Sequence, residues 1–467
     1  MHTGDEFFDS QEFKTILEKY NENPSSLDAD ELTDIADYYS YIGNEDKAIA
    51  VVSMAKRMFP DSIAPISFLA HEALNNQNIK EAKRLIEQII DKSDIEYKLL
   101  SIEILVAENH VQEAEGQLQV LMEGMDDERF EDFVIDVANI YLEYNMPEKA
   151  EQWLNRNKGC EMAEYKELRA KVLLASERIE ECINVFNELI DQNPFSIKYW
   201  NALATVQFIT GNYEEAINSS DYTLAINPNC PDGLFTKGNS LYHLDRYEEA
   251  LKCYKRYIQI RPNDELGYLN AGTCLINIEH YEDAIDTLKK SLDIVRSDSM
   301  QLSMTYQEIA HSYCALKDFN KALEYIELAE KYTKDLPDIL VLKGHILLGM
   351  GNFDDGLEAL TSATRLSKGN NTIFMRMCVS LYENNYMDLA YQLFEKLFEN
   401  CLPTFKDGLS YMALCCRDLN KNEEYLHYLK LAIERNPKEA KMIFGQIFPK
   451  DLKLKDYYEY AKKQIEN

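Results

Sequence analysis

Glycine and proline, which often interrupt helices, are scarce in this chain, with 17 glycines and 12 prolines in 467 residues. Alanine, leucine, glutamate, lysine and tyrosine are abundant instead, and this balance favours helical structure. The hydrophobic share is 46%, which is enough for a folded core. The composition therefore argues against global disorder.

Long hydrophobic runs are also missing. No apolar segment approaches the roughly 20 residues that a membrane-spanning helix needs. The first residues, MHTGDEFFDSQEF, have neither the basic nor the apolar region of a secretory signal, and they lack a cysteine for a lipid anchor. These absences predict a cytoplasmic protein without a membrane partner.

Positive charge is in deficit, since the formal net charge is −32 and the sequence pI is near 4.7. Nucleic-acid binding needs clustered cations, so we expect no nucleic-acid partner. An anionic membrane surface would repel the chain, whereas a basic protein or peptide would be attracted to it. A simpler interpretation is that the charge keeps a long, exposed molecule soluble.

Paired cysteines are absent. The ten cysteines form no C-x-x-C motif, and the only close pair is Cys415–Cys416. Zinc sites and disulfide frameworks need tighter spacing, so we predict no bound metal. Cys182, Cys253 and Cys274 occupy small apolar positions in helical patterns, which predicts buried free thiols in a reducing compartment.

No catalytic motif is visible either. Gly349 and Gly351 lack the strand and lysine of a phosphate loop, and neither a G-x-S-x-G nor an H-E-x-x-H motif occurs. A catalytic α/β domain would need alternating strands and glycine-rich turns. We therefore predict a non-enzymatic protein without a cofactor.

A small residue recurs in a fixed setting, after a turn rich in Gly, Asn and Asp. Gaps of 32 to 38 residues separate its occurrences, and a twelfth unit follows with Tyr425 in its place. Such regularity predicts a repeat array, in which each unit packs only on its neighbours. The recurring residues are Ala48, Ala82, Ala114, Ala150, Cys182, Ala216, Ala250, Ala284, Ala322, Gly356 and Ala390.

Each unit reads as a pair of helices. The segments 197–228 and 231–262 both contain two stretches with apolar residues at i, i+3, i+4 and i+7. Asn-Pro or Arg-Pro ends the second helix, because proline disfavours helix at and before its position. Gly238 and Ala250 are small enough to let the paired helices approach closely.

These units resemble the tetratricopeptide repeat, whose pattern is W-x2-L-G/A-x2-Y, then A-x3-F-x2-A and a terminal proline. Gln207 departs from the pattern at the tyrosine position. The resemblance implies an all-α fold, a right-handed superhelical solenoid of antiparallel helix pairs. The matching residues are Trp200, Leu203, Ala204, Ala48, Val52, Ala55, Pro60, Ala250, Tyr254 and Pro262.

We divide the chain into an N-terminal capping helix at 1–28, about twelve repeats at 29–437, and C-terminal capping helices at 438–467. The ends need caps because a terminal repeat otherwise exposes an apolar face. An irregular stretch is expected near 155–161, and a longer connection near 296–303. The two apolar cap stripes are Phe13, Ile16, Leu17 and Tyr20, then Leu454, Tyr457, Tyr458, Ala461 and Ile465.

The resemblance also implies a binding surface, because the first helix of each repeat lines a concave groove that holds peptides or partner helices. His311 and His345 share one repeat position, so we expect them to be neighbours on the groove wall. Two histidines alone make a poor metal site, and polar contacts or a pH-sensitive contact are the better interpretations. The predicted groove residues are Phe235, Asn239, Tyr242, Leu269, Asn270, Thr273, Gln307, His311 and His345.

Asn239 and Asn270 give the sharpest hypothesis, since an amide can both donate to and accept from a ligand backbone. Relatives that clamp a carboxyl terminus place asparagines at these positions together with three cations. Here the three cation positions hold Phe235, Met304 and Glu308, which argues against such a ligand. Solvated surface amides are the alternative.

Two functions follow from this pattern. The first is an interaction scaffold that binds a peptide or protein segment in its groove. The second is a regulatory sensor that changes curvature when a signal peptide binds. An enzyme subunit resembling repeat-bearing glycosyltransferases is a third and weaker interpretation.

Overall fold

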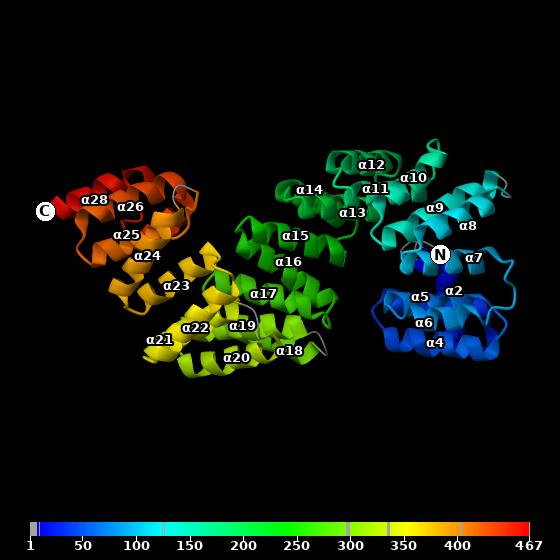
Figure 1. Cartoon of the computed structure of the whole chain (residues 1–467), viewed down its shortest axis with the longest axis horizontal. Coiled ribbons are helices and arrows are strands. Elements are labelled where there is room, and N and C mark those ends of the chain that lie inside the picture. The colour runs from blue at the N-terminus through cyan, green and yellow to red at the C-terminus, as the bar shows by residue number, and fades with distance from the viewer. Residues whose placement is uncertain are drawn as a thin grey trace. The chain divides into compact units, whose positions relative to one another are not determined.

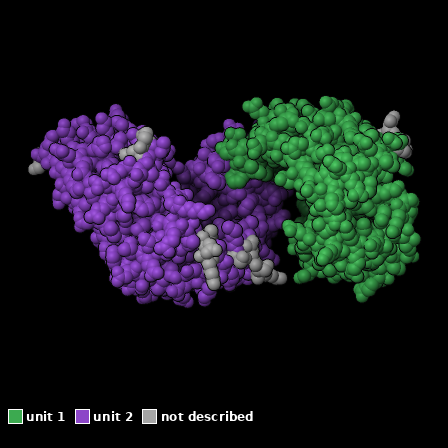
Figure 2. Space-filling model, in the orientation of Figure 1, with its two compact units in different colours: residues 1–212 green, residues 213–467 purple. Residues whose placement is uncertain are grey.

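The computed structural model describes residues 7–8, 10–123, 125, 127–295, 299–333, 337–401 and 404–466. Within these residues every regular element is a helix, as predicted (Figure 1). The chain divides into two compact units, Met1–Asn212 and Tyr213–Asn467 (Figure 2). The division falls at the turn after α13, inside the sixth predicted repeat.

Unit 1 consists of antiparallel helix pairs that pack in sequence order. Two short 3₁₀ turns, η1 (Pro24–Ser26) and η2 (Asn155–Asn157), interrupt the series. Its helices are α2 (Gln11–Glu22), α3 (Ala29–Tyr41), α4 (Glu45–Met58), α5 (Ala64–Asn75), α6 (Ile79–Ile86), α7 (Ile95–Ala107), α8 (Val111–Met122), α9 (Asp127–Glu143), α10 (Pro147–Leu154), α11 (Ala163–Ala175), α12 (Ile179–Gln192) and α13 (Ile197–Ile209).

Unit 2 continues the same pattern, and a 3₁₀ turn η3 (Leu454–Asp456) precedes its last helix. Its helices are α14 (Tyr213–Ile226), α15 (Pro231–His243), α16 (Tyr247–Ile260), α17 (Glu265–Asn277), α18 (Tyr281–Ile294), α19 (Ser299–Ala315), α20 (Phe319–Tyr332), α21 (Pro337–Gly349), α22 (Phe353–Leu366), α23 (Asn371–Glu383), α24 (Met387–Cys401), α25 (Leu409–Asp418), α26 (Asn422–Arg435), α27 (Pro437–Phe444) and α28 (Tyr457–Glu466).

One backbone device recurs at the turn after each first helix, where a residue takes the left-handed conformation. The N–H of the following residue then donates to a carbonyl five residues earlier, at 2.7–2.9 Å. This is the Schellman helix ending, and it reverses the chain into the second helix. The left-handed residues are Gly43, Gln77, Asn109, Asn145, Glu177, Gly211, Asp245, Glu279, Lys317, Gly351, Asn385 and Asn420.

Acidic pairs mark the start of many second helices. Seven of them have two carboxylates in the first turn, for example Glu248 and Glu249 at the start of α16. Negative charge at a helix N-terminus is favourable because the unpaired N–H groups carry partial positive charge. Part of the negative charge of the chain therefore stabilises the N-termini of its second helices.

Close approach within a pair is achieved with small residues, as predicted for Gly238 and Ala250. A Cβ atom at Gly238 would lie 2.8 Å from the ring of Tyr254, and Ala250 is fully buried. All ten thiols are free and nine are buried, so the prediction of buried free cysteines holds for those nine.

The two irregular stretches have different outcomes. Near residue 155 the prediction is confirmed, because α10 is only eight residues long and the η2 turn follows it. The longer connection at 296–303 is wrong for residues 299–303, which are helical. The additional residues lengthen α19 to 17 residues, against 13 in α17. Residues 296–298 lie outside the described part of the chain.

The predicted cap stripes contribute to the cores near the two ends. Phe13 and Ile16 of α2 are buried against the first repeat, and Tyr457 and Ala461 of α28 are buried in the last core. The division into caps and repeats at 28 and 437 remains our proposal.

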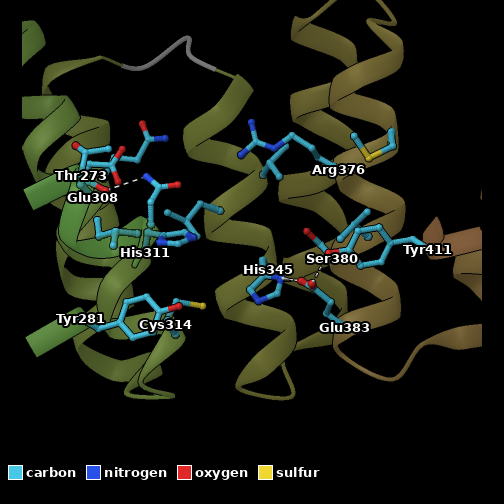
Figure 3. Close-up of a pocket in the computed structure, with 18 of the residues that line it drawn as sticks. Thr273, Tyr281, Glu308, His311, Cys314, His345, Arg376, Ser380, Glu383 and Tyr411 are labelled. Atoms are coloured by element: carbon cyan, nitrogen blue, oxygen red, sulfur yellow. Dashed lines mark hydrogen bonds and ion pairs between the residues drawn. The ribbon is translucent and has the colours of Figure 1, made fainter. Parts of the chain in front are cut away.

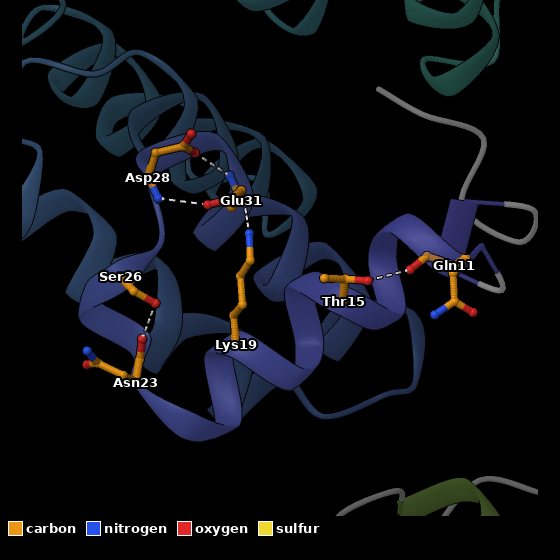
Figure 4. A network of polar contacts seen from close by, with 7 residues as sticks. All are labelled: Gln11, Thr15, Lys19, Asn23, Ser26, Asp28 and Glu31. Carbon is orange, nitrogen blue, oxygen red and sulfur yellow. Dashed lines mark hydrogen bonds and ion pairs between the residues drawn. The ribbon is translucent and has the colours of Figure 1, made fainter.

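Polar contacts fix the N-terminal entry to the first repeat (Figure 4). Asp28 and Glu31 form a reciprocal capping box at the start of α3, which satisfies two helix-terminal N–H groups. Lys19 of α2 approaches the same Glu31 at 3.5 Å. The entry helix is thus tied to the helix it covers.

A pair of substitutions tests the role of the left-handed residues. Glu279 has φ 62°, a conformation that costs a side-chain-bearing residue about 1–2 kcal/mol. We expect Glu279→Gly to raise the free energy of unfolding by up to about 1 kcal/mol, after the entropy of glycine is counted. Gly351→Ala, at φ 84° with open space around it, should lower it by about 1 kcal/mol. Urea unfolding measures both, and equal effects of the two changes would contradict this interpretation.

Candidate protein-interaction groove

A cavity of about 660 Å³ lies in unit 2 (Figure 3). Apart from Tyr281 of α18, its lining comes from the first helices of successive repeats, α15, α17, α19, α21, α23 and α25. We call it the groove. It is lined by Tyr242, Thr273, Ile276, Asn277, Tyr281, Gln307, Glu308, His311, Cys314, Ala315, Val341, Leu342, His345, Met375, Arg376, Val379, Ser380, Glu383 and Tyr411.

The Schellman turn fixes which position of each first helix lines the groove. Asn239, Thr273, His311 and His345 each stand six residues before the left-handed residue of their own repeat. Equivalent positions in successive repeats face the same side. Four neighbouring helices therefore present one polar side chain each in a row.

Five of the nine predicted groove residues line the cavity: Tyr242, Thr273, Gln307, His311 and His345.

The other four lie elsewhere. Leu269 is only 5% exposed and packs in the core. We correct its assignment and leave it out of the ligand-contacting set. Phe235 packs against the rings of Tyr254 and Tyr257, with centroids 6.1 Å and 5.1 Å away, so its ring mainly supports the core.

Asn239 and Asn270 are joined to each other beside the groove. The buried Tyr254 hydroxyl donates to Asn239 Oδ1 at 2.7 Å, and Asn270 Nδ2 donates to the same oxygen at 3.4 Å. Within the described residues, Asn239 Nδ2 and Asn270 Oδ1 have no recorded partner. The pair thus retains one donor and one acceptor.

Two carboxylates stand on opposite walls of the groove (Figure 3). Burial raises the pKa of Glu308 to about 7, and no ion pair to its carboxylate is found among the described residues. Burial also raises the pKa of Glu383, although its carboxylate accepts a hydrogen bond from the Tyr411 hydroxyl at 3.3 Å. Both groups thus lose hydration without gaining a full countercharge.

The two histidines are held neutral. Burial and then the nearby His311 lower the pKa of His345 to about 4. Asn384 Nδ2 lies 3.3 Å from His345 Nδ1, which suits an unprotonated nitrogen. Burial lowers the pKa of His311, and the Arg376 charge lowers it further. At neutral pH both rings offer hydrogen bonds rather than charge.

Metal binding has no support in this geometry. Within the described part of the chain, no three or more His, Cys, Asp or Glu side chains come together as a metal site would require. Burial raises the pKa of Cys314, beside His311, to about 12, so the thiolate that metals prefer is disfavoured.

Sequence reasoning missed the contributions of α23 and α25. Arg376, Glu383 and Tyr411 line the groove, whereas the predicted set ended at α21. Arg376 and Tyr411 each stand nine residues before the left-handed residue of their repeat, Asn385 and Asn420, and Glu308 stands nine residues before Lys317. This fixed offset was the signal that could have found Arg376 and Tyr411.

Unit 1 has charged residues in the corresponding register. Asp37, His71 and Glu103 stand six residues before their turn residues. His71 Nδ1 lies 3.1 Å from Glu103 Oε2, and that glutamate side chain is only 4% exposed. Burial and then Asp34 raise the pKa of Asp37 to about 6. His71 and Glu103 are thus paired with each other, whereas Glu308 in the groove has no such partner among the described residues.

Family models match the centre of the chain. Residues 168–229 match a tetratricopeptide repeat model, and residues 209–291 match the model of anaphase-promoting complex, cyclosome, subunit 3. The chain contains tetratricopeptide repeats. The twelve Schellman turns extend this repeat beyond the matched residues. Tetratricopeptide-repeat proteins are protein–protein interaction scaffolds.

Solved structures give distant likenesses. MamA 41-end from Desulfovibrio magneticus RS-1 is 18% identical and covers 37% of this chain and 96% of its own, with TM-score 0.35. A tetratricopeptide-repeat protein from Parabacteroides merdae ATCC 43184 is 15% identical and covers 54% and 99%, with TM-score 0.43. A chain of the APC/C hetero-tetramer Cut9–Hcn1 is 12% identical and covers 94% of each, with TM-score 0.41. Scores this low indicate nothing about the partner of this tetratricopeptide-repeat protein.

No curated protein matches the chain. Of the helices in the described residues, none combines the length and the apolar character that a membrane span requires.

The neutral state of His345 predicts a dependence of stability on pH. Its folded pKa of about 4 is below the ordinary 6.5, so between these values the unfolded chain binds a proton that the folded chain does not. Stability is therefore lost as pH falls through this window, by about 1–3 kcal/mol from this group. His345→Asn, which can still accept from Asn384, should lose less stability on acidification than the wild type.

Urea unfolding at about pH 7 and about pH 5 measures this effect. His280→Asn is the control, because that side chain is 60% exposed on a turn and should behave as the wild type. If His345→Asn lost as much unfolding free energy between these two pH values as the wild type does, the His345 ring would not be held neutral.

Proposed function

We propose that this chain is a non-enzymatic scaffold whose groove holds an extended segment of a partner protein. The observation that carries the proposal is the groove itself, a single cavity lined by six successive repeats. Extended segments suit such a surface because equivalent side chains recur along it at regular intervals. The general role of tetratricopeptide repeats supports the same function.

The groups that remain free define how the segment would be held. Asn239 Nδ2 can donate to a ligand carbonyl, and Asn270 Oδ1 can accept from a ligand N–H. Gln307 adds a third amide, one that lines the cavity itself, with no recorded contact among the described residues. Backbone recognition by these three amides is independent of the ligand side chains.

Two tyrosine rings, one from the first and one from the last helix that line the groove, offer apolar surface to a ligand. Tyr242 comes from α15 and Tyr411 from α25, and both line the groove. Asn277 Nδ2 donates to the Tyr242 hydroxyl at 3.4 Å, and Tyr411 is held by Glu383. Rings fixed in this way can bind with little loss of conformational entropy.

We also place the protein in the cytoplasm. Nine buried free thiols suit a reducing compartment, and the net charge of −32 favours a basic partner.

A curvature-sensing role is the second candidate, and one contact favours it. Lys438 of α27 pairs with Asp245 in the turn between α15 and α16, although 193 residues separate them in sequence. Both side chains are substantially exposed, at 79% and 40%, so the pair is weak. A change in the curvature of unit 2 would separate these two residues.

The groove is tested by selecting 12-residue peptides from a displayed library on the wild-type chain. The double variant Asn270→Ala/Gln307→Ala removes the free Asn270 Oδ1 and the Gln307 amide, and it leaves the Asn239–Tyr254 bond in place. We expect the selected peptides to bind this variant about tenfold more weakly, at about 1 kcal/mol per hydrogen bond. Fluorescence anisotropy measures the affinity.

Asn218→Ala is the matched control, because Asn218 is an exposed amide on the second helix α14, and its affinity should equal that of the wild type. Equal binding by the wild type and the double variant would refute the groove as the binding surface.

A further inference from the structure

Glu308 is the one carboxylate of the groove whose burial is compensated by no recorded partner. It lies on α19, one residue from Gln307, and lines the cavity. Among the described residues neither a cation nor a hydrogen-bond donor contacts its carboxylate, whereas the Tyr411 hydroxyl donates to Glu383. A desolvated carboxylate in this state is stabilised when a countercharge reaches it or when it takes up a proton.

The cations of the groove do not supply that charge. Arg376 is the only lysine or arginine in the lining, and it is engaged by Asp338 in an ion pair. Figure 3 shows Arg376 on the opposite wall from Glu308. The carboxylate thus faces a cavity large enough for a long side chain.

We propose that the segment bound in the groove inserts a lysine or arginine side chain that pairs with Glu308. This inference rests on the proposed function and names the chemistry of its ligand. Burial and, to a smaller extent, the Glu308 charge raise the pKa of Tyr242, so the two side chains are close, and the tyrosine ring can contact the same cation. The neutral His311 and the amide of Gln307 add no positive charge beside Glu308, and the Arg376 charge, which acts on His311, is paired with Asp338.

A neutral occupant is the alternative, and it would use Glu308 differently. A protonated Glu308 would donate a hydrogen bond to a ligand carbonyl. The two modes depend on pH in opposite directions, because a cation needs the carboxylate and a carbonyl needs the acid. With a pKa of about 7 for Glu308, the deprotonated fraction rises about tenfold between pH 6 and pH 8.

The other titratable groups around Glu308 allow this comparison. Burial lowers the pKa values of His311 and His345, so both are neutral above about pH 6.5. Burial raises the pKa values of Tyr242 and Cys314, so neither ionises below pH 8. Glu383 also has a raised pKa, and its contribution is removed separately with Glu383→Gln.

The test uses the peptides selected on the wild-type chain. We expect one lysine or arginine position to be enriched, and replacement of that residue by norleucine or citrulline to weaken binding at least tenfold. Affinity for the wild type should rise about tenfold from pH 6 to pH 8. Glu308→Gln should bind weakly and without this pH dependence, whereas Glu383→Gln should retain it.

Glu308→Gln is expected to fold. The raised pKa of Glu308 means that its stability contribution is lost as pH rises, and a neutral amide avoids that loss. Glu282→Gln is the control, because Glu282 is an exposed carboxylate at the start of the second helix α18, and it should bind as the wild type does.

The outcomes separate the two proposals. Peptides that lose affinity for Asn270→Ala/Gln307→Ala but show no cationic preference, or that bind more tightly at pH 6, would overturn the cation and leave the groove intact. Peptides that bind the double variant as tightly as the wild type would overturn the groove itself.

Discussion

The Schellman turn between the two helices of each repeat is the constraint on which the rest of the structure depends. It places one left-handed residue at a fixed point and closes it with a hydrogen bond across five residues. The second helix then returns along the first, and the small residues at their contact let them pack closely. Because every repeat reverses in the same way, a position counted back from the turn faces the same side in each repeat.

This constraint separates the core from the groove. Along α17, Leu269 is buried in the core, whereas Thr273, four residues later, lines the cavity. The seam between the helices supplies the apolar burial that holds each repeat. The groove side of the first helices is therefore free to present side chains that add nothing to folding, and a carboxylate such as Glu308 can be tolerated there.

Much of the fold could be predicted from the sequence, because spacing and helix periodicity are local signals. The turns at Gly43, Gly211 and Gly351 are visible as glycines, and they mark the repeat directly. Glu279 and Lys317 adopt the same conformation without any residue preference to reveal it. The additional turn of α19 could not be predicted either, because the longer spacing between repeats fits a longer loop as well as a longer helix.

The groove could be predicted only in part, since its chemistry comes from residues of different repeats. His311 and His345 were paired by register, but their neutral state depends on burial by neighbouring helices and on each other. Asn239 was singled out as an amide that could bind a ligand backbone, but the bond from Tyr254 that orients it joins two helices. The state of Glu308 likewise depends on surrounding helices that exclude water.

The net charge of the chain and the charge of the groove have different physical origins. Acidic pairs at the starts of second helices are exposed and interact with helix dipoles. Water and salt screen such charges, so they attract basic partners over distance without holding them in one place. Glu308 is a single carboxylate that is poorly hydrated, so a cation that reaches it gains more than one at the exposed helix starts. For a basic partner of the kind we propose, long-range attraction and local selection would act in sequence, with the exterior raising its encounter rate and the groove fixing its position.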